Sequence, residues 1–337
     1  MFVVDAHLDI AYNGTHGRDV TRPASEQPPD EGDIATVGLP DLRAGGVGLV
    51  CATVFCEPAI DGKHGYHTAE EAHREAWKQV RWYQEQQAAG RMRFVAESND
   101  LPHADDKRTT GDAQPAILLL EGADAMRSPA DVGPWVEAGL KVVGLAWKRT
   151  RMAGGTGAPG PLTDEGLRLV RELDAHGIVH DASHLAEESF WRLLDVSGGP
   201  VIASHSNCRR IVPTDRQLSD DMVRAIAARG GVVGINFYDK FLLPPAEYGT
   251  RRATLADVVR HVQHVCDLAG NTACVGIGTD MDGGLGREQI PAEITTSADL
   301  PRLADALAAA GFGDQDVVRV MGTNWLHFFA RVLPRGV

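Results

Sequence analysis

The chain has 337 residues, of which 43% are hydrophobic and 23% charged, a composition typical of a globular protein. It holds 33 basic against 46 acidic residues, a formal net charge of −13. A surface of that sign repels nucleic acids and anionic membranes, so we expect a small molecule as the partner. The length suits either one large α/β barrel or two ordinary domains.

The cysteines and the N-terminal segment indicate a reducing compartment. No basic region followed by a secretory apolar segment opens the sequence, and no apolar run reaches the roughly 18 residues of a membrane span. The five cysteines are odd in number and lack CxxC spacing, which favours reduced thiols over disulfides or a zinc ribbon. We therefore expect a cytoplasmic protein.

Short apolar runs alternate with longer amphipathic stretches, which is the pattern of β-strands followed by α-helices. The predicted strands are Val3–Ala6, Val47–Val54, Ala116–Leu120, Val142–Ala146, Ile178–Asp181, Val201–Ser204, Val232–Asn236 and Cys274–Gly278. A doubly wound sheet would show a Gly-rich dinucleotide turn after an early strand, and none is present. The sequence therefore predicts an α/β protein with one (β/α)8 TIM barrel over residues 1–337.

Helix start signals support this division of the chain. Thr68, Thr163, Ser219 and Thr254 each precede an amphipathic stretch as N-cap residues do. A Gly- and Pro-rich segment at about 13–35 is interpreted as a solvated loop or, alternatively, as a flap over the barrel mouth. A further helix is predicted at about 314–332.

Residues that can bind metal follow the ends of several predicted strands, where the chemistry of such barrels lies. In chain order these ends carry His7 and Asp9, Glu121, Trp147, His184, His205, Phe237 and Tyr238, and Asp280. Histidine makes up only 13 of the 337 residues, yet three of eight ends carry one. Three imidazoles with three carboxylates suit Zn²⁺, with other divalent ions as alternatives.

The spacing of these residues suggests how ions would be shared. On a strand, residues i and i+2 point to the same face, so His7 and Asp9 can bind one ion together. Glu121 is the natural bridge between two ions, which are then held about 3.5–4 Å apart. Each residue alone has a simpler explanation: His184 could begin a helix, and Asp280 could cap a Gly-rich turn. Their order around the barrel favours a metal centre.

These motifs, in this order and spacing, resemble the membrane (renal) dipeptidase family of binuclear zinc peptidases on (β/α)8 barrels. The resemblance covers nearly the whole chain and rests on "DAHLD", "LPDLRAGGVG", "LEGAD", "GIVHDASH", "PVIASHSN", "DRQLSDDMV", "GVVGINFY", "GIGTDMDG" and "VMGTNWLHFF". It implies hydrolysis of free dipeptides by a hydroxide that bridges two zinc ions. It also implies that His7 and Asp9 bind one zinc, that His184 and His205 bind the other, and that Glu121 bridges both.

The resemblance assigns two further residues to the reaction. It implies that Asp280 orients the nucleophile and passes its proton to the departing amine. Arg216, eleven residues after His205, corresponds to the arginine that receives the terminal carboxylate, a role for which the planar guanidinium is suited. From its neighbours alone, Arg216 would instead be expected to pair with Asp215 or Asp220.

Trp147 departs from the family pattern, because many members have at the aligned position a histidine that contacts the reacting carbonyl. We interpret Trp147 as a wall of the substrate pocket, with zinc alone stabilising the oxyanion; alternatively another donor has taken over. Lys148, Arg149 and Arg151 follow it, and we hypothesise that they favour an acidic group on the substrate, unless they are simply solvated. His180 is expected to be a buried structural histidine.

Two other functions stay open. One is an amidase that acts on N-acyl amino acids or lactams with the same metals. The other is a metal-binding protein that is non-catalytic or acts as a sensor; the full ligand set, with Asp280 and Arg216, argues against it. The resemblance also leaves a homodimer open.

Overall fold

The computed structural model describes residues 1–29, 33–60, 64–105 and 112–335. Its strands are β1 (Val3–Leu8), β2 (Val47–Phe55), β3 (Met92–Phe94), β4 (Gln114–Glu121), β5 (Leu140–Gly144), β6 (Val179–Asp181), β7 (Val201–Ile202), β8 (Val233–Ile235) and β9 (Val275–Ile277). Apart from β3, each lies within or overlaps one of the eight predicted strands. The predicted strand set is therefore confirmed.

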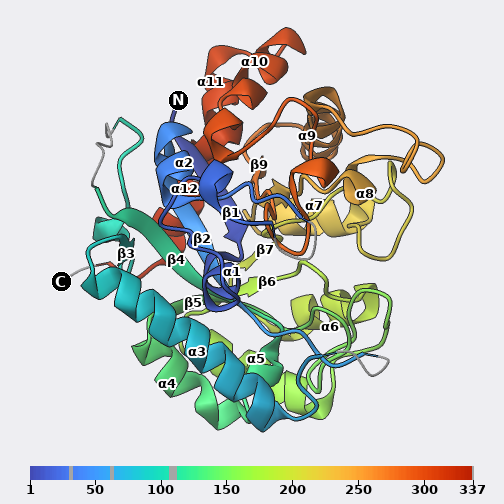
Figure 1. Cartoon of the computed structure of the whole chain (residues 1–337). Helices are drawn as coiled ribbons and strands as arrows, with labels where there is room; N and C mark the ends of the chain where they lie inside the picture. Colours follow the sequence, from blue (N-terminus) through green and yellow to red (C-terminus); the bar gives the residue numbers. More distant parts are fainter. Residues whose placement is uncertain (30–32, 61–63, 106–111, 336–337) are drawn as a thin grey trace.

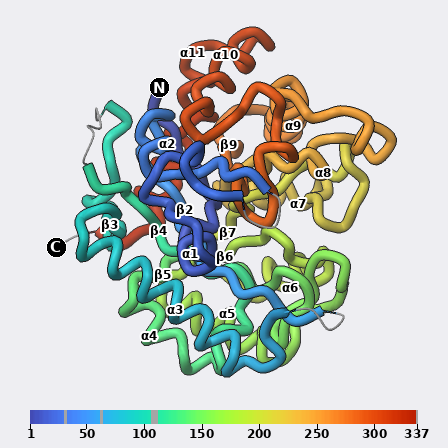
Figure 2. The backbone as a smooth tube through the Cα atoms, viewed as in Figure 1, coloured from blue at the N-terminus to red at the C-terminus, as the bar shows by residue number. Residues whose placement is uncertain are grey.

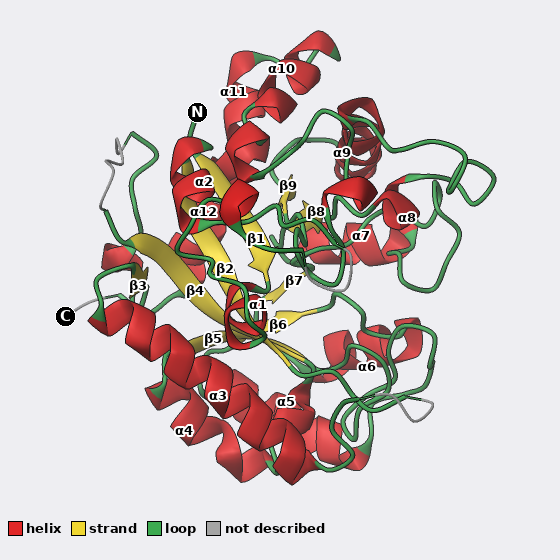
Figure 3. Ribbon diagram, in the orientation of Figure 1, coloured by secondary structure: helices red, strands yellow, loops and turns green. Residues whose placement is uncertain are grey.

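The strands form a nearly closed parallel barrel surrounded by helices (Figures 1 and 3). Neighbouring strands follow the order β7-β6-β5-β4-β2-β1-β9-β8. A parallel bridge between Ala203 and Val233 brings the two ends of this order together, with Gly234 N donating to Ala203 O at 2.8 Å. The predicted TIM barrel is confirmed, and the C-terminal ends of its strands meet at one mouth.

Strand β3 was not predicted. It pairs with the start of β4, Met92 opposite Gln114 and Phe94 opposite Ala116. Its sequence, Met-Arg-Phe, is too short to show a period, so the pairing depends on β4 rather than on its own residues.

The helices are α1 (Ile10–Thr15), α2 (Leu39–Ala44), α3 (Ala69–Ala88), α4 (Val132–Glu137), α5 (Asp164–Ala175), α6 (Glu187–Val196), α7 (Asp220–Ala228), α8 (Asp239–Leu242), α9 (Leu255–Ala269), α10 (Arg302–Ala309), α11 (Asp314–Val318) and α12 (Asn324–Val332). The predicted N-caps Thr68, Thr163, Ser219 and Thr254 stand directly before α3, α5, α7 and α9. A π-helical turn, Arg319–Thr323, joins α11 to α12 in the predicted C-terminal helical region. No helix among the described residues is long and apolar enough to cross a membrane. The tube in Figure 2 follows these helices around the barrel.

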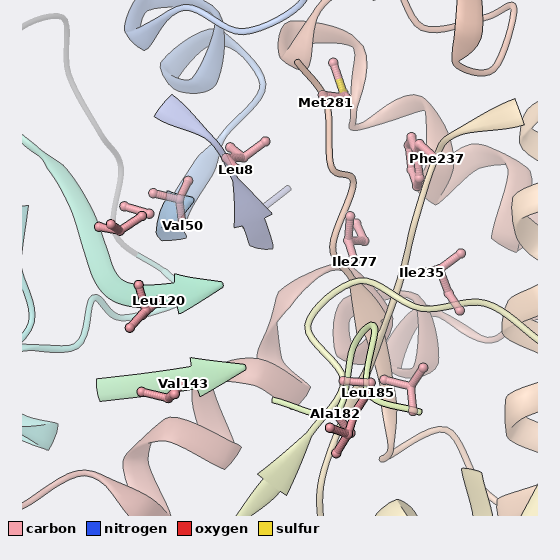
Figure 4. Close-up of a cluster of buried hydrophobic side chains, with 14 of the residues drawn as sticks. Leu8, Val50, Leu120, Val143, Ala182, Leu185, Ile235, Phe237, Ile277 and Met281 are labelled. Atoms are coloured by element: carbon pink, nitrogen blue, oxygen red, sulfur yellow. The ribbon is translucent and has the colours of Figure 1, made fainter. Parts of the chain in front are cut away.

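Two buried apolar clusters hold the strands in place. One includes Leu8, Val50, Leu120 and Val143, which project from β1, β2, β4 and β5 (Figure 4). The other combines alternate residues of six strands with aromatic side chains of α12. The Trp325 ring packs so tightly on β9 that a Cβ added to Gly276 would lie 2.3 Å from its Nε1. Helix α12 therefore closes one side of the core, and the mouth at the other end carries the polar residues.

The Gly- and Pro-rich segment and the residue that follows it are tied to the barrel; residues 30–32 lie outside the described part of the chain. Arg18 Nη1 lies 3.2 Å from Asp282 Oδ2, and Thr36 Oγ1 donates to Asp282 Oδ1 at 2.6 Å. This segment is thus fixed to the turn that follows β9.

Candidate metal centre and substrate cavity

Six predicted site residues come from five strand ends and meet at the barrel mouth. His7 lies in β1, Asp9 directly follows that strand, and Glu121 is the last residue of β4; the loops after β6, β7 and β9 supply His184, His205 and Asp280. Five of the six are buried, and the side chain of His184 is 9% exposed. The structure therefore brings together every residue that the sequence proposed as a metal ligand.

The carboxylate of Glu121 lies at the centre of the three imidazoles. Its Oε2 is 3.6 Å from His7 Nε2, and its Oε1 is 3.3 Å from His184 Nε2 and 3.4 Å from His205 Nε2. The two oxygens of one carboxylate therefore face different histidines, as a bridging ligand requires.

A second group of possible ligands joins the first at His7. Ligand atoms of His7, Glu121 and His205 lie within 4.8 Å of one another, and so do those of His7, Asp9 and Asp280. Strand β1 ends at Leu8, however, and Asp9 is the N-cap of α1 with φ −81° and ψ 47°. The predicted closeness of His7 and Asp9 is correct, but a turned backbone produces it rather than strand alternation.

Three polar atoms of this centre lack a hydrogen-bond partner. Within the described part of the chain, buried His7 Nε2, Asp9 Oδ1 and Glu121 Oε1 have no hydrogen-bond partner. Buried polar atoms are almost always paired, so three unpaired atoms in one place are typical of a site that binds a ligand. Imidazole nitrogens and carboxylate oxygens together fit a divalent cation such as Zn²⁺.

The pKa shifts of the site residues are also consistent with a metal site. Burial, reinforced by the neighbouring carboxylate of Glu121, raises the pKa of Asp280 to about 7 and raises that of Asp9 as well. Burial opposes a charge on His7, but the nearby carboxylates outweigh it and raise its pKa to about 10. Burial also lowers the pKa of His184 and His205, with the positive charges of Arg216 and His7 adding to it, so that these imidazoles favour the neutral form that binds metal. A divalent cation would balance the carboxylates buried together here.

Backbone strain is concentrated in the same place. Among the described residues other than glycine, only His184, Asp280 and Asp282 have positive φ, at 63°, 61° and 62°. Such conformations cost on the order of 1–3 kcal/mol each and cluster at functional sites.

A cavity of about 340 Å³ opens above this centre. Trp147 lines it, with its ring 5.2 Å from that of Phe55 and 6.1 Å from that of His184, which agrees with its interpretation as a pocket wall. Other lining residues are Tyr12, Glu57, Lys148, Thr156, Tyr238, Phe241 and Leu285.

The three cations that follow Trp147 have different surroundings. Arg151 pairs with Glu165 at 2.7 Å, and Arg149 donates to the carbonyl oxygen of Pro159. Lys148 lines the cavity, with its Nζ 5.6 Å from the centre of the Trp147 ring and no carboxylate in ion-pair contact among the described residues. Of the hypothesised group, Lys148 is the residue available to a substrate.

Arg216 is buried, with 4% of its surface exposed, beside the metal centre. It donates from Nη1 to Ser206 Oγ at 2.9 Å and from Nη2 to His205 O at 2.7 Å, and it stacks 5.1 Å from the centre of the Phe241 ring. The expectation of a pair with Asp215 or Asp220 is wrong. Those carboxylates instead accept from Gly157 N and contact His264, respectively.

Several residues around the centre were not singled out from the sequence. Asn236 Nδ2 donates to Asp280 Oδ2 at 2.9 Å, and Asp181, Ser204 and Thr156 contact the imidazoles or their partners. Asn236 and Ser204 stand at the ends of predicted strands, so the same strand-end rule could have found them. His180, predicted to be structural, is buried with its Nε2 2.7 Å from Asp174 Oδ1.

Buried imidazoles and carboxylates around one bridging carboxylate, at the mouth of a parallel barrel, define a metal-dependent hydrolase. The profile described as membrane dipeptidase (peptidase family M19) matches residues 1–333. The chain belongs to this family and is a metal-dependent dipeptidase.

Individual relatives and solved structures are similar to this chain over most of its length. A protein of Klebsiella pneumoniae encoded in the pqqA 5′ region is 29% identical over 255 residues, 73% of this chain and 90% of that protein. The solved structure of dipeptidase AC, a metallopeptidase, has a TM-score of 0.82 and 26% identity over 99% of both chains. A metallopeptidase of Rhodobacter sphaeroides, liganded with a phosphinate mimic of the dipeptide L-Ala-D-Ala, has a TM-score of 0.81 and 26% identity over 98% of this chain and 99% of that one.

Proposed function

We propose that this chain hydrolyses free dipeptides with two zinc ions at its barrel mouth. In this proposal His7 and Asp9 hold one ion, His184 and His205 hold the other, and Glu121 bridges them. The observation that carries it is the position of Glu121, whose two oxygens face histidines of both sets. When bound, two such cations lower the pKa of a shared water and polarise the peptide carbonyl.

Asp280 is proposed to orient the attacking water and to carry its proton. Asn236 holds one carboxylate oxygen, Oδ2, from 2.9 Å, so Oδ1 can face the water. A pKa raised to about 7 by burial suits a group that takes up and releases a proton near neutral pH. The proton then passes to the amine that leaves the broken peptide bond.

Arg216 is proposed to receive the terminal carboxylate of the substrate. A buried cation without an ionic partner is costly, and the described residues give Arg216 no carboxylate in ion-pair contact and leave its Nε without a partner. A substrate carboxylate would supply the missing charge beside Phe241, whose ring lines the cavity. Glu57 adds a carboxylate to the cavity lining, which suits the free ammonium of a dipeptide.

Free dipeptides fit the charges of Arg216 and Glu57 better than N-acyl amino acids or lactams do, because a dipeptide carries both a carboxylate and a free ammonium group. The Rhodobacter relative, whose ligand imitates L-Ala-D-Ala, supports the same substrate class. Trp147 is proposed to act as a wall of the pocket, and bound metal ions would stabilise the oxyanion.

The test combines metal content per chain with hydrolysis of a library of L-X-D-Y dipeptides, before and after chelation. We expect close to two zinc ions per chain, and activity that is lost on chelation and restored by zinc. A zinc-loaded protein that cleaves N-acyl amino acids but no dipeptide would overturn the proposal.

A further inference from the structure

Ser204 connects two of the three site histidines through a single hydroxyl group. Its Oγ lies 2.9 Å from His7 Nδ1, 2.9 Å from His205 Nδ1 and 2.5 Å from Asp181 Oδ2. A contact of 3.4 Å with Ser183 Oγ is longer than these three. Ser204 is fully buried, so water cannot replace these partners.

The donor and acceptor count fixes the direction of each bond. A hydroxyl has one proton to donate and two lone pairs to accept with, and an ionised carboxylate only accepts. The Ser204 proton therefore points to Asp181, and both lone pairs accept from imidazole N–H groups. In both rings Nδ1 then carries a proton, and Nε2 is the nitrogen left to bind metal.

Asp181 is itself held in one orientation. Its Oδ1 accepts from the backbone N–H groups of Ser204 at 2.8 Å and Ser183 at 3.0 Å. With Oδ2 occupied by the hydroxyl of Ser204, the buried carboxylate has no freedom to turn away.

The two rings served by Ser204 belong to different ions in the proposed function. His7 is placed with one ion and His205 with the other, and their ring centroids are 3.6 Å apart. His184, the remaining imidazole, has a separate partner, because its Nδ1 lies 3.0 Å from Thr156 Oγ1. One hydroxyl thus orients a ligand of each ion, whereas Thr156 orients a ligand of one ion alone.

We propose that Ser204, oriented by Asp181, is a positioning residue that couples the two metal positions, an inference that rests on the proposed two-metal function. Loss of its hydroxyl frees the ring orientation and the tautomer of both histidines at once. Both ions are then bound more weakly. Loss of the Thr156 hydroxyl weakens only the ion held by His184.

The experiment is a zinc titration of the metal-free full-length chain against a chromophoric chelator, which yields two dissociation constants. We expect Ser204→Ala to raise both by about 10- to 100-fold, the usual effect of removing a hydrogen-bond partner of a ligating histidine. Thr156→Val, the matched control, raises only one. The absorption spectrum of the Co²⁺-loaded chain reports ligand geometry independently of activity, and we expect Ser204→Ala to change the bands of both ions.

Asp181→Asn provides a second test with little change of shape. Its amide can donate to Ser204 Oγ, which turns the serine proton toward one imidazole and forces that ring's own proton onto Nε2. We expect at least one zinc constant to rise about 10-fold or more. The coupling is refuted if Ser204→Ala folds and binds both ions with the dissociation constants of the wild type. If Ser204→Ala does not fold, the coupling is refuted when Asp181→Asn leaves both dissociation constants unchanged. A wild-type chain that binds fewer than two zinc ions overturns the proposed function itself.

Discussion

The substitution Arg216→Lys tests how the substrate is held, because it keeps the charge and removes the planar fork. A guanidinium has five N–H donors. In the described structure Arg216 uses one on Nη1 and one on Nη2, so three are left, including the buried Nε–H. Two of these can bind a carboxylate side by side.

The expected loss follows from these bonds. A hydrogen bond to a charged group contributes about 1.5–3 kcal/mol, and lysine can replace one of the two as a point charge. The net loss is that of one such bond, about 1.5–3 kcal/mol, which corresponds to a fall in kcat/KM of about 13- to 160-fold.

The assay compares the dipeptide Ala-Ala with its C-terminal amide. Arg216→Lys should lower kcat/KM for the free acid and leave that for the amide nearly unchanged, because the amide has no carboxylate to lose. Arg210→Lys, at an exposed arginine nearby, is the matched control and should change neither value. An equal fall in kcat/KM for the acid and the amide would mean that Arg216 acts only by supporting Ser206 and His205. The proposed binding of the substrate carboxylate by Arg216 would then be refuted.

Three further predictions concern other residues. Asp280→Asn should lower kcat by about 10²- to 10⁴-fold with the zinc content of the chain unchanged; loss of one zinc, measured by elemental analysis, would instead make Asp280 a ligand. Lys148→Met should reduce a preference for Ala-Asp over Ala-Asn by about fivefold, which is the contribution of one partly exposed ion pair. Equal kcat/KM values for the two peptides in the wild type would show that Lys148 does not select acidic substrates. Burial opposes the charge of Asp257, but hydrogen bonds from Arg251 and Thr254 outweigh it and lower its pKa to about 2. Its ionised form therefore stabilises the folded chain above pH 4, and this contribution is lost as the pH falls toward 2. In urea unfolding, Asp257→Asn should cost about 2 kcal/mol at pH 6 and progressively less below pH 4, whereas a constant difference would contradict the assignment.

The barrel could be predicted because its strands and helices carry strong local signals. Buried parallel strands are continuous apolar runs, and residues such as Thr68 mark helix starts by satisfying free N–H groups. Strand β3 could not be predicted, since its three residues become a strand only when β4 lies beside them.

The metal centre could be predicted for a related reason. Parallel strands deliver their following residues to the same mouth, so the order of His7, Glu121 and His205 along the chain already implied that they meet. The hydrogen bonds that orient them could not be inferred in this way. Ser204 and His7 are 197 positions apart, and neither residue's neighbours indicate the contact. For Arg216 the neighbouring residues were misleading, because carboxylates close in the sequence suggested an ion pair that the fold does not form.

The strained turn after β9 shows why the N-terminal segment belongs to the site. Positive φ at Asp280 and Asp282 persists only if the surrounding structure holds it in place. Asp282 is held by N–H groups of Thr36 and Val37, at 2.8 and 2.9 Å, and by the ion pair with Arg18. Arg18 lies within the segment predicted as a loop or flap, and Thr36 and Val37 directly follow it, so this part of the chain helps to fix the backbone from which Asp280 projects. The position of Asp280, the carboxylate proposed to carry the proton, thus depends on a part of the chain for which no metal ligand is proposed.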